Sequence, residues 1–133
     1  MKAQKAKVLF NAVVADGASI PHHCPNYDIV NFSIYSVGAT TATIKIQVSD
    51  QELAPDFGAA ASPTNDWSYA STQNIDTTLA VNGSTGYALG ADHILHVTLN
   101  DAGGHKWIGA IISGWQAGAI TVLATPYQIS DVG

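Results

Sequence analysis

The sequence predicts an all-β fold: an antiparallel β-sandwich, jelly-roll-like, formed by a single domain over residues 1–133. Apolar and polar residues alternate along several short segments, which is the pattern of half-buried strands. Turn residues separate these segments at intervals of about 8–12 residues, as in sandwiches and barrels. No segment has the spacing of an amphipathic helix, and a chain of this length can form one core without disulfides.

The alternating segments place the strands along the chain. The clearest strand spans residues 42–49, and a strand ending near residue 35 precedes it; we expect the two to form a hairpin around Gly38. We expect Pro126 to end the last strand. The predicted apolar faces are Val8, Phe10, Ala12 and Val14; Val30, Phe32 and Ile34; Ala42, Ile44, Ile46 and Val48; Leu95, Val97 and Leu99; and Ile120, Val122 and Ala124.

The remaining segments are less regular. Residues 67–71 and 75–81 are predicted as short strands, and residues 50–66 as a long loop suited to a functional or partner-binding role. Residues 107–127 carry no charge, but their turn at 115–118 and their β-branched residues favour a β-hairpin over a membrane-spanning helix. Because the strand beginning at Trp107 is apolar on both faces, we expect it to be central or buried at an interface.

Charge limits the classes of partner. The chain carries a net charge of −5, no arginine, and only 11% charged residues. These values argue against disorder and against nucleic-acid binding, which favours a basic stripe. A surface with few charges tolerates burial against another chain, which points to an oligomer or an assembly component. Lys2, Lys5 and Lys7 form a short basic N-terminal arm at about residues 1–7, either a solvated end or a contact to an acidic partner.

The titratable residues predict no catalytic, metal or cofactor site. His22, His23 and Cys24 are adjacent in an extended loop, so their side chains point in different directions and a shared metal is the minor interpretation. Most carboxylates lie in predicted turns, and none of the common hydrolase, phosphate-binding or dinucleotide-binding motifs is present. We therefore expect a protein that is not an enzyme. With one cysteine and no visible signal peptide, we expect folding in a reducing cytoplasm.

The aromatic residues leave two interpretations open. Aromatic rings stack on sugars, so a glycan-binding face could be lined by the aromatic residues Trp67, Trp107, Trp115, Tyr27, Tyr35, Tyr69, Tyr87 and Tyr127. Alternatively, most aromatic residues belong to the core or to an interface, which is the interpretation we favour. The first interpretation predicts a solvent-exposed cluster drawn from Trp67, Tyr69, Tyr87 and Trp115.

Residues 31–125 resemble a known class of viral proteins. The resemblance is carried by Phe32, the alternating segment 38–50, Asp66-Trp67 after the long loop, the apolar segment 107–115, and Ala117-Gly118 leading to Ile120-Thr121-Val122. Together these features are similar to small bacteriophage structural β-sandwich proteins, which decorate capsids or form head fibres and tail fittings. The likeness covers about three-quarters of the chain. The class has no catalytic motif, so the resemblance transfers no catalytic residue.

The resemblance implies a virion structural protein, and we predict a capsid decoration (cement) protein that binds the outer phage head and stabilises capsomer joints. Its expected partner is the major capsid protein, and a homo-oligomer is expected, with a trimer favoured. Neither nucleic acid nor a membrane is an expected partner. The expected location is the capsid surface of the virion, after assembly in the host cytoplasm. The predicted partner-binding residues are Lys2, Lys5, Lys7, Pro55, Phe57, Trp67 and Trp115.

Two alternatives belong to other classes of function. The first is a carbohydrate-binding module, or a fibre or tail tip that recognises host glycans. The second is a small enzyme, which would require a concave pocket with converging polar groups.

Overall fold

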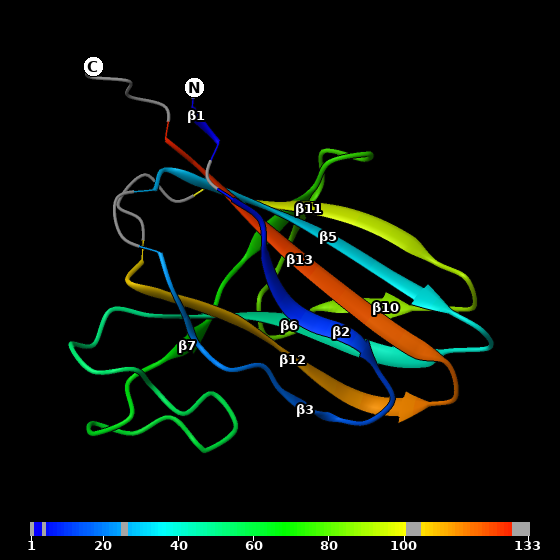
Figure 1. Ribbon diagram of the computed structural model, residues 1–133, viewed down its shortest axis with the longest axis horizontal. Coiled ribbons are helices and arrows are strands. Elements are labelled where there is room, and N and C mark those ends of the chain that lie inside the picture. The colour runs from blue at the N-terminus through cyan, green and yellow to red at the C-terminus, as the bar shows by residue number, and fades with distance from the viewer. Residues whose placement is uncertain (1, 4, 25–26, 101–104, 129–133) are drawn as a thin grey trace.

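The computed structural model describes residues 2–3, 5–24, 27–100 and 105–128, and these residues form two antiparallel sheets packed face to face (Figure 1). The prediction of an all-β sandwich is confirmed. Sheet A contains β1 (Lys2–Ala3), β2 (Lys7–Val13), β5 (Ile29–Val37), β8 (Thr72–Asn74), β9 (Ala80–Val81), β11 (Ile94–Asn100) and β13 (Ala119–Gln128). Sheet B contains β3 (Gly17–Ala18), β4 (His22–His23), β6 (Thr41–Ser49), β7 (Ser68–Tyr69), β10 (Tyr87–Leu89) and β12 (Trp107–Gln116).

The order of the strands is that of a jelly roll. The main strands of sheet A lie in the order β2-β13-β5-β11, and those of sheet B in the order β10-β6-β12, with β3 and β4 on the far side of β12. The chain passes between the sheets from β2 to β3, β4 to β5, β5 to β6, β7 to β8, β9 to β10, β10 to β11, β11 to β12 and β12 to β13. Such alternation gives a double-sheet jelly roll.

The core lies between the sheets and is formed by the predicted alternating residues. Every second side chain of β5, β6, β11, β12 and β13 points inward, because successive residues of a strand face opposite sides. The fully or almost fully buried members include Val30, Phe32, Ile34, Ala42, Ile44, Ile46, Val48, Val97, Leu99, Ile108, Ala110, Ile112, Ile120, Val122 and Ala124. The prediction that the Trp107 strand is central is confirmed, since β12 lies between β6 and β3–β4.

The predicted hairpin around Gly38 is wrong. β5 belongs to sheet A and β6 to sheet B, so residues 38–40 carry the chain across the sandwich. The hairpin predicted over residues 107–127 is wrong for the same reason: residues 117–118 carry the chain from β12 in sheet B to β13 in sheet A, at the same end of the molecule (Figure 1). The two crossings touch, because a Cβ on Gly38 would lie 3.3 Å from the Cα of Gly118, and both glycines have positive φ.

The first strand departs from the predicted alternation. Leu9 and Phe10 are both buried, whereas Val8 is half exposed and Val14 lies exposed beyond the strand. The register between β2 and β13 shifts twice, and Ala12 has a φ of 51°. These irregularities are β-bulges, which turn consecutive side chains to the same face of the sheet.

Two other boundaries differ from the prediction. Residues 75–79 form the turn between β8 and β9 rather than a strand, and the Thr78 amide donates to the Asn74 carbonyl at 2.8 Å. Pro126 does not end β13; it lies opposite Val30, and pairing continues to Gln128.

Candidate functional site

The outer face of sheet B is covered by the protein's own long loop. Phe57 is only 1% exposed and packs on Gly109 of β12, where a Cβ would lie 2.6 Å from two ring carbons. The Gln47 side-chain amide donates to the Phe57 carbonyl at 2.8 Å. The absence of a side chain at Gly109 therefore creates the space that receives the phenyl ring.

The loop at residues 50–66 has a defined internal structure. The Asn65 carboxamide accepts from the Asp56 amide at 2.8 Å and donates to the Asp56 carbonyl at 2.9 Å. The indole N–H of Trp67 donates to the Ala59 carbonyl at 2.9 Å. These bonds pin the tip of the loop to its own base, so the loop is preformed over the sheet.

The start of the same loop is fixed to β12 and its neighbours. The Trp107 indole N–H donates to the Gln51 carbonyl at 3.0 Å, and the His23 ring lies 4.8 Å from the Trp107 ring. Lys106 Nζ lies 3.0 Å from a Glu52 carboxylate oxygen, and this hydrogen bond lowers the pKa of Glu52. Sheet B is thus closed from outside by contacts within the chain.

A small aromatic cluster borders the loop. The rings of Trp67 and Tyr69 meet edge to face at 5.0 Å, and Lys45 Nζ lies 5.0 Å from the centre of the Tyr69 ring. Both aromatic side chains are half-buried. Of the four residues from which the glycan hypothesis draws its cluster, Trp67 and Tyr69 therefore come together. Tyr87 is buried with its hydroxyl bonded to Thr72, and the Trp115 indole N–H donates to the Gly118 carbonyl.

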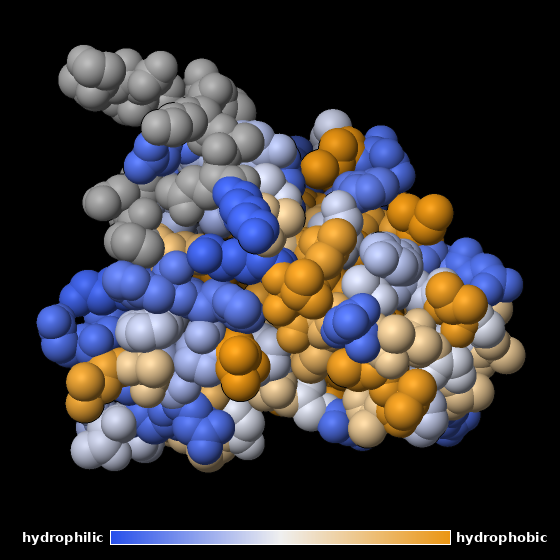
Figure 2. Space-filling view, in the orientation of Figure 1, coloured by the Kyte–Doolittle hydropathy of each residue, from blue (hydrophilic) through white to orange (hydrophobic). Residues whose placement is uncertain are grey.

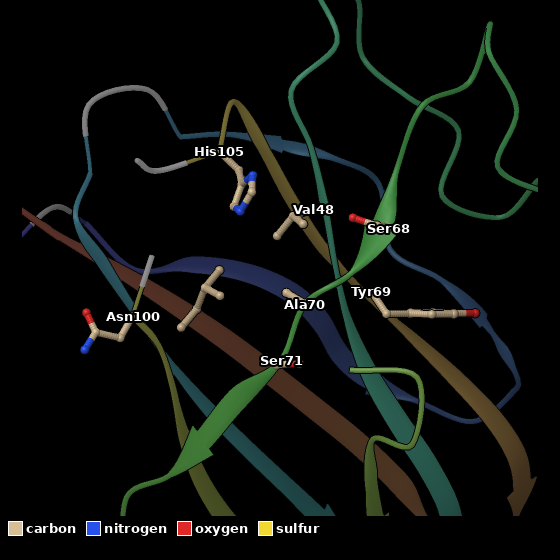
Figure 3. Close-up of a pocket in the computed structure, with 8 residues that line it drawn as sticks. Val48, Ser68, Tyr69, Ala70, Ser71, Asn100 and His105 are labelled. Atoms are coloured by element: carbon tan, nitrogen blue, oxygen red, sulfur yellow. The ribbon is translucent and has the colours of Figure 1, made fainter. Parts of the chain in front are cut away.

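A polar cleft opens where β7 and the chain after it approach β11 (Figure 3). It has a volume of about 380 Å³ and is lined by Val48, Ser68, Tyr69, Ala70, Ser71, Leu99, Asn100 and His105. His105 Nδ1 lies 3.1 Å from an Asp50 carboxylate oxygen. Hydroxyl, amide and imidazole groups here can hydrogen-bond a small polar ligand, but no reaction follows from them, and the prediction of no enzymatic activity stays a prediction.

The outer face of sheet A is not covered by any described segment in the way that sheet B is. Tyr35 (37% exposed), Val37 (63%) and Ile94 (68%) protrude from β5 and β11. They surround a shallow hollow of about 640 Å³ that also includes Ser33, Ser36, Asp92, His96 and Leu123. Figure 2, which shows one side of the molecule, has hydrophobic residues gathered over the β2–β13 region and mostly hydrophilic residues toward the long loop.

The predicted partner-binding residues do not form one surface. Pro55 and Phe57 belong to the long loop at residues 50–66, and both are buried. Trp67 and Trp115 are half-buried, and the indole N–H of each donates a hydrogen bond. These side chains have intrachain roles, and their contact with a partner stays a prediction.

The basic arm is partly incorporated into sheet A. Lys2 lies in β1 opposite Gln128, although its side chain is outside the described residues. Lys5 is exposed, and Lys7 begins β2 and is half-buried. Its positive charge, after the larger effect of burial, helps to lower the pKa of His22.

Sequence reasoning missed Val37 and Ile94, and it named Tyr35 only as one of eight aromatic residues that could line a sugar-binding face. All three side chains lie at the outward-facing positions of β5 and β11, where the alternating pattern predicts polar residues. That mismatch was the available signal: an apolar side chain on the outer phase of a strand marks a face that is not simply solvated.

The soft-ligand residues do not gather around a metal position. His22 is half-buried, His23 faces Trp107, and Cys24 is fully buried, with desolvation raising the pKa of its thiol to about 11. Within the described residues, His, Cys, Asp and Glu side chains form no group of three that could hold a metal ion. The same part of the chain has no helix long and apolar enough to cross a membrane.

Comparison with known proteins identifies the fold but no family. No family model and no curated protein matches the sequence. A solved structure, the SPBc2 prophage-derived protein YomS, is similar in fold with a TM-score of 0.69; the alignment covers 95% of each chain at 10% identity. At this identity the likeness establishes a shared sandwich architecture.

Proposed function

We propose that this chain is a structural protein of a bacteriophage virion that acts by binding other protein chains. The observation that carries the proposal is the apolar outer face of sheet A, which protrudes into solvent at Tyr35, Val37 and Ile94. Exposed apolar patches on small sandwich proteins mark interaction surfaces. The similar fold of a prophage-derived protein supports a phage origin.

The specific role that we propose is capsid decoration. A decoration protein at the outer head surface would contact the major capsid protein across capsomer joints and would act as an oligomer. Because a ligand that binds only the assembled shell stabilises it by mass action, its effect would increase with its free concentration. The exposed lysine Lys5 and the preformed loop at residues 50–66 are suitable contacts to an acidic shell surface and to a neighbouring subunit.

Binding to phage heads tests this proposal. Purified protein is mixed with expanded heads from its own phage, and co-sedimentation and the melting temperature of the shell are measured. We expect saturable binding and a higher melting temperature. Absence of binding together with an unchanged melting temperature would remove the decoration role.

Glycan binding is the second candidate function, and the cluster of Lys45, Trp67 and Tyr69 favours it. Half-buried aromatic rings beside a cation provide both stacking and hydrogen bonding. The polar cleft beyond Tyr69 adds neutral donors and acceptors.

A panel of host-surface glycans measured by calorimetry distinguishes the two functions. A fibre-tip role predicts binding that Tyr69→Ala abolishes and that Tyr35→Ala on the opposite sheet leaves intact. Equal loss in both variants, or no binding by the wild-type protein, would rule out this cluster as the glycan site.

A further inference from the structure

The three central strands of sheet A are without formal charge. β5, β11 and β13 contain no Asp, Glu, Lys or Arg along their whole lengths. One carboxylate lies at the rim of the hollow, that of Asp92, and it accepts a hydrogen bond from the Gly38 amide at 2.8 Å. The three strands themselves therefore offer no Asp, Glu, Lys or Arg for a charged ligand to pair with, and Asp92 supplies the one formal charge among the residues that line the hollow.

The same face carries both protrusions and a depression. Ile94 and Val37 protrude, while the hollow between them is bounded on the other side by Leu123 of β13 and Ser33 of β5. The register explains this relief: Ile94 lies opposite Tyr35, whereas the next outward row places the small Ser33 between His96 and Leu123. The row with the large side chains of Ile94 and Tyr35 therefore lies beside a row whose central side chain, Ser33, is small.

A second copy of the chain is the occupant that we argue for, because the same face carries both the protrusions and the hollow. Each copy carries a net charge of −5, so two copies repel one another at long range. In a two-fold interface, residues near the axis meet their own counterparts, and like charges there would oppose association. The three strands contain no such charge, and the one carboxylate, that of Asp92, lies at the rim, where it accepts a hydrogen bond from the Gly38 amide. The apolar protrusions of one copy have a hollow with apolar lining residues in the other copy.

We propose that the outer face of β5, β11 and β13 is the surface through which two copies of this chain associate, with Ile94 and Val37 of each copy directed toward the hollow of the other. The inference deepens the proposed function, on which it rests, because it names the surface of self-association. It assigns that association to sheet A and leaves the long loop and the N-terminal lysines for other contacts.

Sedimentation velocity over a range of protein concentrations tests the assignment. The variants are Ile94→Glu and Val37→Glu, which place like charges on the proposed face. The matched control is Ile20→Glu, because Ile20 is 72% exposed between β3 and β4 of sheet B and undergoes the same substitution as Ile94. We expect the wild-type protein and the control to self-associate equally, and each sheet A variant to weaken association at least tenfold.

Circular dichroism and thermal melting establish that each variant is folded. If a glutamate prevents folding, Ile94→Thr provides a neutral β-branched substitute that should still weaken association measurably. A wild-type protein that stays monomeric at every concentration would overturn the inference, as would self-association unchanged by the sheet A variants.

Head binding separates the inference from the proposed function. Monomeric wild-type protein that still binds phage heads would overturn the sheet A interface alone. Protein that associates through sheet A but does not bind heads would overturn the decoration role alone.

Discussion

Sheet A and sheet B have outer faces that the chain completes in different ways. On sheet B, Phe57 from the long loop packs into the space above Gly109, and Trp107 is held between Gln51 and His23. On sheet A, Val37 and Ile94 stand in solvent around a shallow hollow. The difference teaches that one chain can cover one face of a sandwich with its own loop and leave apolar side chains exposed on the other.

The largest expected effect lies on the covered face. Phe57→Ala removes a phenyl ring that is 1% exposed, and we expect it to lower the free energy of unfolding by about 3–5 kcal/mol. Urea denaturation measures the change, with Leu53→Ala in the same loop as the control, which we expect to stay within about 0.5 kcal/mol of wild type. A loss below about 1 kcal/mol would mean that the loop is not part of the folded core.

A pH titration of stability tests the interior of the sandwich, because the thiol of Cys24 is buried in the core. Burial raises the pKa of Cys24 from 9.0 to about 11, so the folded state keeps this proton while the unfolded chain releases it. The contribution of the protonated thiol to stability should therefore be fully present below pH 9. As the pH rises toward 11 this contribution is lost, which lowers the free energy of unfolding by at most about 3 kcal/mol.

The matched variant for this titration is Cys24→Ala. The raised pKa of Tyr87 acts in the same direction at high pH, and the variant keeps that contribution. Denaturant midpoints measured across this range should fall less steeply for Cys24→Ala than for the wild-type protein. Identical slopes would contradict the assignment to the thiol.

Gly109 tests the fit of the loop on sheet B. The Cβ of Gly109→Ala would lie 2.6 Å from the Phe57 ring and 2.8 Å from Ser19 Oγ, and we expect a loss of about 1–3 kcal/mol from overpacking. Most of this loss should vanish in the Phe57→Ala background, which a double-mutant cycle measures. Gly90→Ala is the control, because a Cβ there meets nothing closer than 3.8 Å. Additive losses would show that the two residues do not share the contact.

The smallest effect is expected on sheet A. Ile94→Thr replaces a side chain that is 68% exposed, so in dilute protein we expect a change in unfolding free energy within about 0.5 kcal/mol. Thermal melting at two protein concentrations measures it. A loss comparable to that of Phe57→Ala in the dilute sample would mean that Ile94 belongs to the core of one chain.

The inner faces of the sandwich were predictable from sequence, whereas the partners of the strands were not. Alternation correctly identified Phe32, Ile44 and Val122 as core residues, because a period of two fixes which side of a strand is buried. It carries no information on whether two consecutive strands pair in one sheet or face one another across the core. For this reason the turn at Gly38 was interpreted as a hairpin, although it is a crossing between sheets.

Irregular segments limited the prediction of the surface. Phe57 lies in a loop without periodicity, and its burial depends on a glycine far along the chain, so no local pattern reveals the contact. The bulges that bury both Leu9 and Phe10 also break the period of β2. On sheet A, the outward-facing Tyr35 and Ile94 were visible in the sequence, but their meaning depended on knowing which strands lie side by side.

Side-chain oxidation footprinting of dilute and assembled protein tests the difference between the two faces most directly. The account predicts that Tyr35 and Ile94 lose reactivity on assembly, while Phe57 is protected in both states and Leu53 stays reactive unless it contacts the head. The account would be contradicted if Tyr35 and Ile94 remained fully reactive in the assembled state and protection were confined to residues 50–66.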